Sequence, residues 1–231
     1  GKYIGVMAFE EFFSKELLES QGRRESVILK FDESLLWSTG GGMPFENFMN
    51  NPIKPFRFKR IKKSKKLFED LKTATGLLRG FSDGTLSSSQ VFDVELMGRY
   101  LAVSSVWGAW HALRWRNLRF YYNPITSKIE PISYDADLPY FKRDPVDPSN
   151  RPFSEALLQS DLKIRPFYEK TLEKLKHESE KGITEEWVGP IQKRNLRILH
   201  KEYPLLGGIN LFGMAESASQ SLQSSKSFID R

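Results

Sequence analysis

Residues 107–137 read WGAWHALRWRNLRFYYNPITSKIEPISYDAD, and this stretch decides how the rest of the chain is interpreted. Residues 118–122 are mostly aromatic, which suits a pleated strand. Residues 123–127 place a proline among small polar residues and predict a turn. Residues 130–134 predict a returning strand. The stretch is therefore expected to form an antiparallel β-hairpin.

Polar side chains stand at the open end of this predicted hairpin. Asn117 precedes the first strand, whereas Asp135 and Asp137 follow the second. Because the strands are antiparallel, these ends are expected to lie together. Amide and carboxylate oxygens suit Mg²⁺, which usually shares its ligand shell with phosphates, and protein kinases hold the metals on ATP with such an Asn and Asp. The alternative is a solvated turn, with Asn117 as a strand cap.

The composition excludes several kinds of site. The 231 residues are enough for one substantial domain or two lobes. The absence of cysteine excludes thiol catalysis, disulfides and thiolate metal sites, and the three histidines are too far apart to suggest zinc. No run of about 18 apolar residues predicts a membrane-spanning helix. The chain starts at Gly1 without a signal-like segment, and we interpret it as a fragment of a longer protein.

The pattern of the whole chain predicts an α+β fold, because strands are expected early and helices late. Residues 89–110 are apolar on nearly every side and predict one buried helix. Ile191, Leu196 and Ile198 are expected to be buried in the last helix. The expected strands are 2–9, 26–31 and 53–61, and the expected helices are 10–20, ended by Gly22, then 64–80, 153–160, 164–182 and 185–203.

The expected architecture is a protein-kinase-like fold of two lobes. Its N-terminal lobe would be β-rich and incomplete, and its C-terminal lobe would be mainly helical and carry the metal and nucleotide site. The predicted parts are residues 1–82, residues 83–213 and a serine-rich tail, residues 214–231.

Lys30 stands near the end of the second expected strand, where Glu10 or Glu11 from the preceding helix could pair with it. In kinases such a lysine and helix carboxylate hold the phosphates of ATP. Arg23 and Arg24 are rival phosphate contacts, because guanidinium groups match phosphate geometry. The alternative is that Lys30 is a surface residue at a strand end.

Several segments between about residue 1 and residue 205 resemble the CotH family of atypical kinases (spore coat protein H-like). The resemblance implies phosphoryl transfer from ATP, with Mg²⁺ or Mn²⁺, to serine or threonine of a protein. The matching segments are GKYIGV (1–6), FSKELL (13–18), RRESVILKFDE (23–33), NLRFYYNP (117–124) and PISYDAD (131–137).

The resemblance also assigns roles to the residues of the hairpin. Asp135 would be the first metal ligand, Asp137 a second carboxylate and Asn117 the ligand on the other face of the metal. The lysine that contacts the nucleotide would be Lys30 or would lie upstream of Gly1. The family further implies an extracellular, cell-surface or spore-associated setting, with a substrate such as a Ser/Thr-rich coat protein.

The chain departs from the kinase pattern at the catalytic base. Kinases place a base Asp five residues before the metal-binding Asn, and here that position is Ala112. His111 is the candidate base, because imidazole titrates near neutral pH, although it could equally cap the end of the preceding helix. The missing Asp leaves open slower phosphoryl transfer, another ATP-driven modification or a nucleotide-binding pseudokinase.

A basic segment accounts for much of the net charge of +6. Residues 54–66 (KPFRFKRIKKSKK) hold eight basic residues and no acidic one. Such a segment suits an acidic partner, anionic lipid or nucleic acid. Phe56 and Phe58 stand between the charges, as in single-strand binders, but also fit an alternating strand. A solvated surface or an acidic partner is favoured over nucleic acid.

Overall fold

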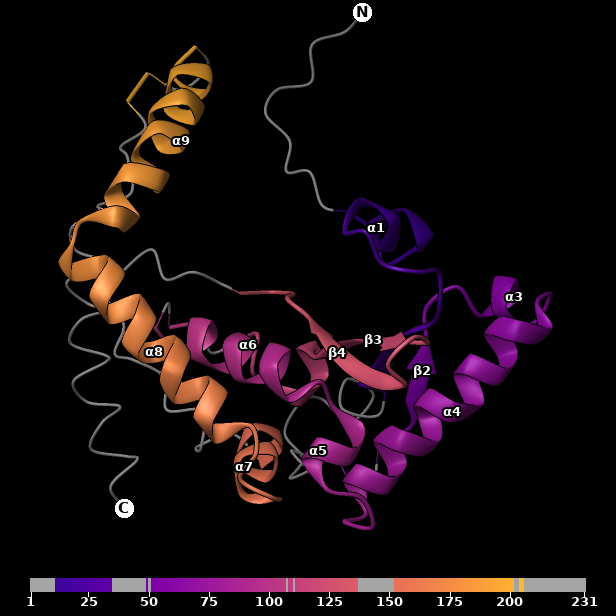
Figure 1. Cartoon of the computed structure of the whole chain (residues 1–231). Helices are drawn as coiled ribbons and strands as arrows, with labels where there is room; N and C mark the ends of the chain where they lie inside the picture. The colour runs from indigo at the N-terminus through magenta and orange to yellow at the C-terminus, as the bar shows by residue number, and fades with distance from the viewer. Residues whose placement is uncertain are drawn as a thin grey trace, which may run out of the picture.

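A four-stranded antiparallel sheet lies at the centre of the computed structural model, with its strands in the order β2-β1-β3-β4 (Figure 1). The structure describes residues 11–34, 49, 51–106, 108–109, 111–136, 152–201 and 204–205. The strands are β1 (Ile28–Phe31), β2 (Ile53–Pro55), β3 (Arg119–Asn123) and β4 (Lys128–Ile132). The α+β class is therefore confirmed.

The predicted hairpin is confirmed as β3 and β4. Arg119 pairs with Ile132 and Asn123 pairs with Lys128, and the turn between them includes Ser127 at φ 55°. The strand expected over residues 26–31 is confirmed as β1. It pairs with β3 on one side and β2 on the other, so that Lys30 lies between Arg119 and Lys54.

The outer strands of the described sheet each contain a proline. Pro55 ends β2, and Pro131 lies within β4 opposite Phe120. Proline lacks an N–H donor for the hydrogen-bond ladder. It is therefore tolerated on an outer strand, where its nitrogen can face away from the neighbouring strand. The single strand expected over residues 53–61 was wrong, because Pro55 ends the strand and Arg57 then turns the chain at φ 56° into α3 (Phe58–Ile61).

The main hydrophobic core covers one face of the sheet. Phe153 of α7 (Pro152–Gln159) packs in its centre against rings from several elements. The opposite face carries Ile28 and Tyr121, which pack against Leu18 of α1 (Lys15–Ser20) and against Phe13 just before that helix. The main core includes residues on both sides of the boundary predicted near residue 82, among them Leu29, Leu78, Leu101 and Leu172.

Three long helices are held by a buried apolar face or by close contact with another helix. In α4 (Lys65–Ser82), Ser64 caps the first turn by accepting from Leu67 N at 3.3 Å, and Leu67 and Leu78 are buried. α8 (Arg165–Glu180) lies along α6 (Val94–Val106) (Figure 1). A Cβ atom at Gly98 would lie 2.7 Å from Phe167 Cβ, so only glycine permits this approach.

The single helix predicted for residues 89–110 was wrong, because the chain breaks at Phe92 and Asp93. α5 (Ser88–Val91) ends where Phe92 bridges to Ile129, whose carbonyl accepts from Asp93 N at 3.0 Å. Asp93 Oδ1 then accepts from Leu96 N at 3.0 Å and caps α6. Pairing with the sheet thus replaces one turn of helix.

The first and last helices also differ from the prediction. The helix expected over residues 10–20 begins only at Lys15, while Gly22, at φ 65°, ends it as predicted. In α9 (Ile183–Leu199), Ile191 and Ile198 are 52% and 59% exposed, so their predicted burial was wrong. Figure 1 shows α9 projecting away from the sheet, where the sheet cannot cover its apolar side chains.

Some expectations lie outside the described residues, namely the strand at residues 2–9 and the tail at residues 214–231. Among the residues that the structure does describe, no helix is long and apolar enough to cross a membrane.

Asp161 ties α5 to the segment before α8. Its Oδ1 accepts from Ser88 Oγ at 2.8 Å and its Oδ2 from Ser89 N at 3.0 Å. Partial burial alone would raise the pKa of Asp161, but hydrogen bonds from Ser89, Ser88 and Ser87 outweigh it and hold that pKa far below 3.8. The ionised carboxylate therefore stabilises the fold.

Asn in place of Asp161 is expected to lower the free energy of unfolding by about 1 kcal/mol at neutral pH, the usual contribution of a cap. Because the pKa of Asp161 is depressed in the folded state, the wild-type advantage is complete above the ordinary carboxyl pKa of 3.8, and it is lost as pH falls through the folded pKa. Urea unfolding of both proteins at neutral pH and below pH 3.8 measures this. A difference that stays constant with pH would contradict it.

Candidate functional site

The open end of the hairpin brings Asn117 and Asp135 into contact. Asn117 is the last residue of the 3₁₀ turn η2 (Trp115–Asn117), and its Nδ2 donates to Asp135 Oδ2 at 2.6 Å. The same Nδ2 donates to the backbone carbonyl of His111 at 3.0 Å. Both amide hydrogens are thereby used, which leaves Oδ1 as the amide atom suited to a cation.

His111 lies against the same carboxylate. Its Nδ1 is 3.3 Å from Asp135 Oδ2, and the two side chains are 27% and 40% exposed. The imidazole and the Asn117 amide thus meet on one oxygen of Asp135, at a place that solvent reaches. A carboxylate in this position fixes the orientation of the ring.

Asp135 has an unusual backbone conformation at the site. Its φ is 49°, in the left-handed region where a residue with a side chain carries a cost of order 1 kcal/mol. Aspartate tolerates this region better than most residues. Asp137, the second predicted carboxylate, lies outside the described residues.

Arg119 also belongs to the site, although no role was predicted for it. Its guanidinium is buried, and Nη1 donates to the carbonyls of Arg116 at 2.8 Å and Leu118 at 3.1 Å, on either side of Asn117. The guanidinium carbon is 4.3 Å from the ring centroid of Tyr134, the residue before Asp135. Arg119 therefore contacts both segments that carry the candidate ligands.

The surroundings of Arg119 explain how a buried cation is tolerated. Burial lowers the pKa of Arg119, while Tyr134, Glu33 and Asp135 act in the opposite direction. The rings of Phe13 and Phe56 lie 5.5 and 5.7 Å from the guanidinium carbon and offer it their π faces. One signal for this role was available in the sequence, because Arg119 is a charged residue within a strand of mostly aromatic residues.

Lys30 lies beside Arg119 but pairs with a different carboxylate from the one expected. Its Nζ is 3.5 Å from Glu33 Oε1, just beyond the end of β1. Glu11 is exposed and precedes α1, because the helix begins later than predicted. Glu10 lies outside the described residues. The Lys30 and Glu11 pair is therefore replaced by Lys30 and Glu33.

The two arginines before β1 have different surroundings. Arg23 Nη2 is 3.0 Å from Oε2 of the buried Glu130, whose Oε1 accepts from Asn123 Nδ2 at 2.6 Å. Arg23 thus neutralises a buried carboxylate of the hairpin. Arg24 is exposed, and its backbone carbonyl accepts from Tyr121 Oη at 2.7 Å.

Ala112, which the kinase pattern places at the position of a base, is fully buried. Its carbonyl accepts from Tyr100 Oη at 2.6 Å, which anchors this loop to α6. A carboxylate at this position would enter the core. His111 is therefore the residue of the loop that faces Asp135.

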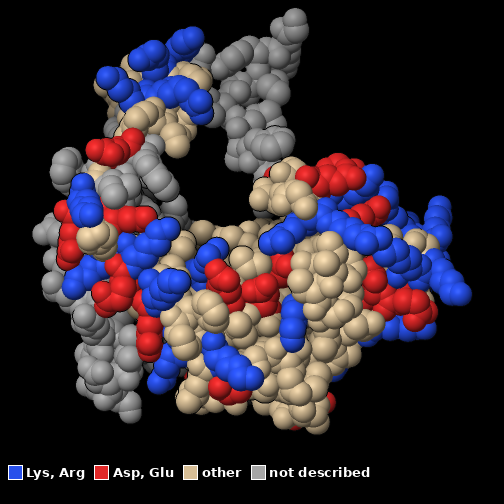
Figure 2. Space-filling view, viewed as in Figure 1, with Lys and Arg blue, Asp and Glu red and all other residues tan. Residues whose placement is uncertain are grey.

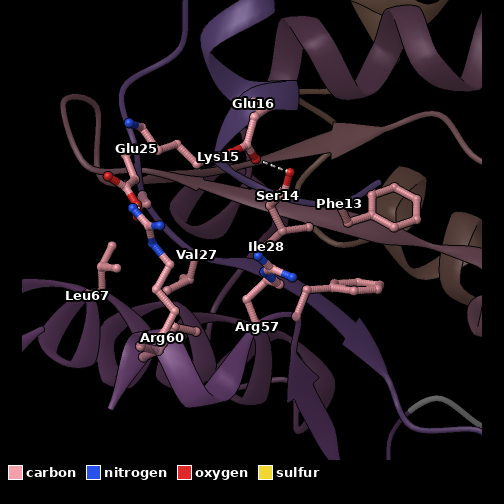
Figure 3. A pocket seen from close by; sticks show the side chains of 13 residues that line it. Phe13, Ser14, Lys15, Glu16, Glu25, Val27, Ile28, Arg57, Arg60 and Leu67 are labelled. Carbon is pink, nitrogen blue, oxygen red and sulfur yellow. Dashed lines mark hydrogen bonds and ion pairs between the residues drawn. The ribbon is translucent and has the colours of Figure 1, made fainter. Parts of the chain in front are cut away.

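A small cavity lies between α1, β1 and α3, away from these residues (Figure 3). It encloses about 40 Å³ and is bordered by the ion pair of Arg60 with Glu25 at 2.6 Å. Pockets for small-molecule ligands usually enclose about 300 Å³ or more. Because His111, Asn117 and Asp135 do not line it, we assign it no part in the candidate site.

The side chains at the open end of the hairpin suit a metal ion that needs few protein ligands. No group of three or more His, Asp or Glu side chains that could hold a metal ion occurs within the described residues. Asn117 and Asp135 offer an amide oxygen and a carboxylate. Mg²⁺ commonly binds with one or two protein ligands and completes its shell with water and phosphate oxygens. The pair suits such an ion better than a metal held by protein alone.

No family model matches the sequence, and no curated protein matches it significantly. The resemblance to CotH kinases therefore depends on the quoted segments.

Proposed function

We propose that this chain is a CotH-like atypical kinase domain, which transfers phosphate from ATP to serine or threonine of a protein. The contact of Asn117 with Asp135 at 2.6 Å, with His111 on the same carboxylate oxygen, is the observation that supports it most strongly. The proposal includes a kinase-like arrangement of two lobes, with residues 1–82 forming part of the N-terminal lobe.

Asn117 and Asp135 would hold Mg²⁺ or Mn²⁺, with Asp137 as a further carboxylate. The bound ion would neutralise charge on the phosphates of ATP. Lys30 and Arg24 are the proposed contacts of the nucleotide phosphates, because both are cationic and lie on or before β1. Glu11, which is exposed, is a weaker part of the proposed nucleotide site.

His111 would act as general base for the substrate hydroxyl. With Nδ1 directed at Asp135, its Nε2 is the atom that would accept the proton. A general base contributes about 10²- to 10⁴-fold to the rate. His111→Gln is therefore expected to slow transfer by that factor while leaving ATP binding in place.

A nucleotide-binding pseudokinase is the second candidate, and the burial of Ala112 favours it. In that case the chain would bind ATP with metal but transfer no phosphate. Another ATP-driven modification of proteins would share the binding step and differ in the product.

Thermal unfolding with ATP and Mg²⁺, separately and together, tests the binding step. A ligand at 100 times its dissociation constant stabilises by about 2.7 kcal/mol, so a shift that needs both is expected. Incubation with labelled ATP and a serine-rich protein then tests transfer. Absence of the joint shift would overturn the proposal, and a joint shift without transfer would select the pseudokinase.

Arg119→Lys is expected to weaken Mn²⁺ binding in the presence of ATP by about 10-fold, because losing a residue that orients metal ligands typically costs 10- to 100-fold. Lysine keeps the charge but cannot bridge the Arg116 carbonyl and the Tyr134 ring in the same way. Titration followed by the electron paramagnetic resonance signal of free Mn²⁺ measures it.

Arg79→Lys is the matched control, since Arg79 donates to the carbonyls of Met49 and Asn51 at 2.9 and 2.7 Å, away from the hairpin. The control should keep the wild-type Mn²⁺ affinity. An equal loss in both variants would mean that Arg119 acts only through general stability.

A further inference from the structure

The predicted basic segment forms an exposed corner where α3 meets α4. All eight of its cations are exposed. Lys54 pairs with Asp32 at 2.7 Å and Arg60 with Glu25 at 2.6 Å. The other six make no ion pair with any described carboxylate. We call these six the basic corner: Arg57, Lys59, Lys62, Lys63, Lys65 and Lys66. Figure 2 shows Lys and Arg gathered at the right-hand edge, where Figure 1 places α3 and the start of α4.

The basic corner carries an electrostatic cost at the start of α4. Lys65 and Lys66 stand in the first turn of α4, where positive charge is unfavourable, and no acidic residue occurs in that turn. An external anionic surface would remove this cost.

Two large aromatic side chains accompany these charges. Phe58 is 43% exposed and Phe68 is 38% exposed. Lys62 Nζ lies 4.7 Å from the Phe58 ring centroid, and Lys72 Nζ lies 5.2 Å from that of Phe68. Each ring is therefore exposed to solvent with an ammonium group over one face.

We propose that the basic corner binds the surface of an anionic lipid bilayer, with Phe58 and Phe68 entering the boundary between headgroups and acyl chains. Aromatic rings insert there while lysines extend to the phosphates, as in interfacial amphipathic helices. Nucleic-acid bases instead stack on ring faces, and here an ammonium group lies over one face of each ring. The corner also lies at the periphery of the molecule, where a flat surface can reach it (Figure 1).

Sedimentation of the chain with vesicles tests this, without ATP or metal. Vesicles of phosphatidylcholine with phosphatidylserine should bind the protein, and vesicles of phosphatidylcholine alone should not. Each lysine near an anionic membrane contributes about 5-fold in affinity, so the triple variant Lys62→Gln, Lys63→Gln, Lys66→Gln should bind about 100-fold more weakly. The control Lys163→Gln, Lys170→Gln, Lys174→Gln removes the same charge from the region of α8 and should bind within about twofold of wild type.

A second pair of measurements separates lipid from other polyanions. Phe58→Ser with Phe68→Ser should weaken vesicle binding by about 10-fold or more, since each buried ring contributes apolar area. Equal losses in the two lysine variants would overturn the proposal. Binding of a single-stranded oligonucleotide without vesicle binding would overturn it in favour of nucleic acid, and unchanged vesicle binding by the double Phe variant would overturn ring insertion.

Discussion

Alanine in place of Asp135 is expected to abolish the joint stabilisation by ATP and Mg²⁺ that the proposed function predicts for the wild-type protein. Asp135 accepts from Asn117 and faces His111, so its loss removes the carboxylate on which the proposed site converges. The loss amounts to about 2.7 kcal/mol at 100 times the wild-type dissociation constant. Thermal unfolding and titration calorimetry measure it.

Asp83→Ala is the matched control for this experiment. Asp83 is an exposed aspartate whose Oδ1 accepts from Thr85 N at 3.0 Å, in the loop after α4. Its removal should lower stability slightly and leave the shift produced by ATP and Mg²⁺ intact. A wild-type shift that persists in Asp135→Ala would show that the ligands bind elsewhere.

Phe153→Ala is expected to lower the free energy of unfolding by about 4 kcal/mol, the usual size for a buried phenylalanine. The Phe153 ring is 1% exposed and lies 5.5 Å from Phe120 and 5.6 Å from Phe81, measured between centroids. It also meets Phe31 and Phe92 at 5.9 Å. Truncation would leave a cavity at the point where the sheet, α4 and α7 meet.

Urea unfolding measures this effect, with Phe12→Ala as the control. Phe12 is 57% exposed, so its truncation should cost less than about 0.5 kcal/mol. A loss below about 1 kcal/mol for Phe153→Ala would show that the core collapses into the space and that this ring does not hold the elements together.

The parts of the fold that were predicted correctly are formed by interactions between residues close together in the sequence. The hairpin follows from a strand of mostly aromatic residues, a proline turn and a returning strand, and this local pairing also placed Asn117 near Asp135. Gly22 and Ser64 ended and began helices as expected, because caps act within one turn. Local rules were sufficient for the two candidate ligands that the structure describes.

The errors arise where distant segments compete with a local pattern. Phe92 has an apolar helical context, yet its backbone meets Ile129 of the hairpin and interrupts the helix. The roles of Arg119 and Glu33 depend on strand β1 lying next to β3, which periodicity cannot specify. Ile191 and Ile198 show the converse, since an apolar stripe does not reveal whether a partner element covers it.

The prolines of the outer strands limit how this chain can aggregate. A further strand joins a sheet by pairing with a continuous row of donors and acceptors, and Pro55 and Pro131 each leave that row without an N–H. β2 is also only three residues long. At the two outer strands of the described sheet, neither a second copy nor a fibril can therefore extend the β-structure easily.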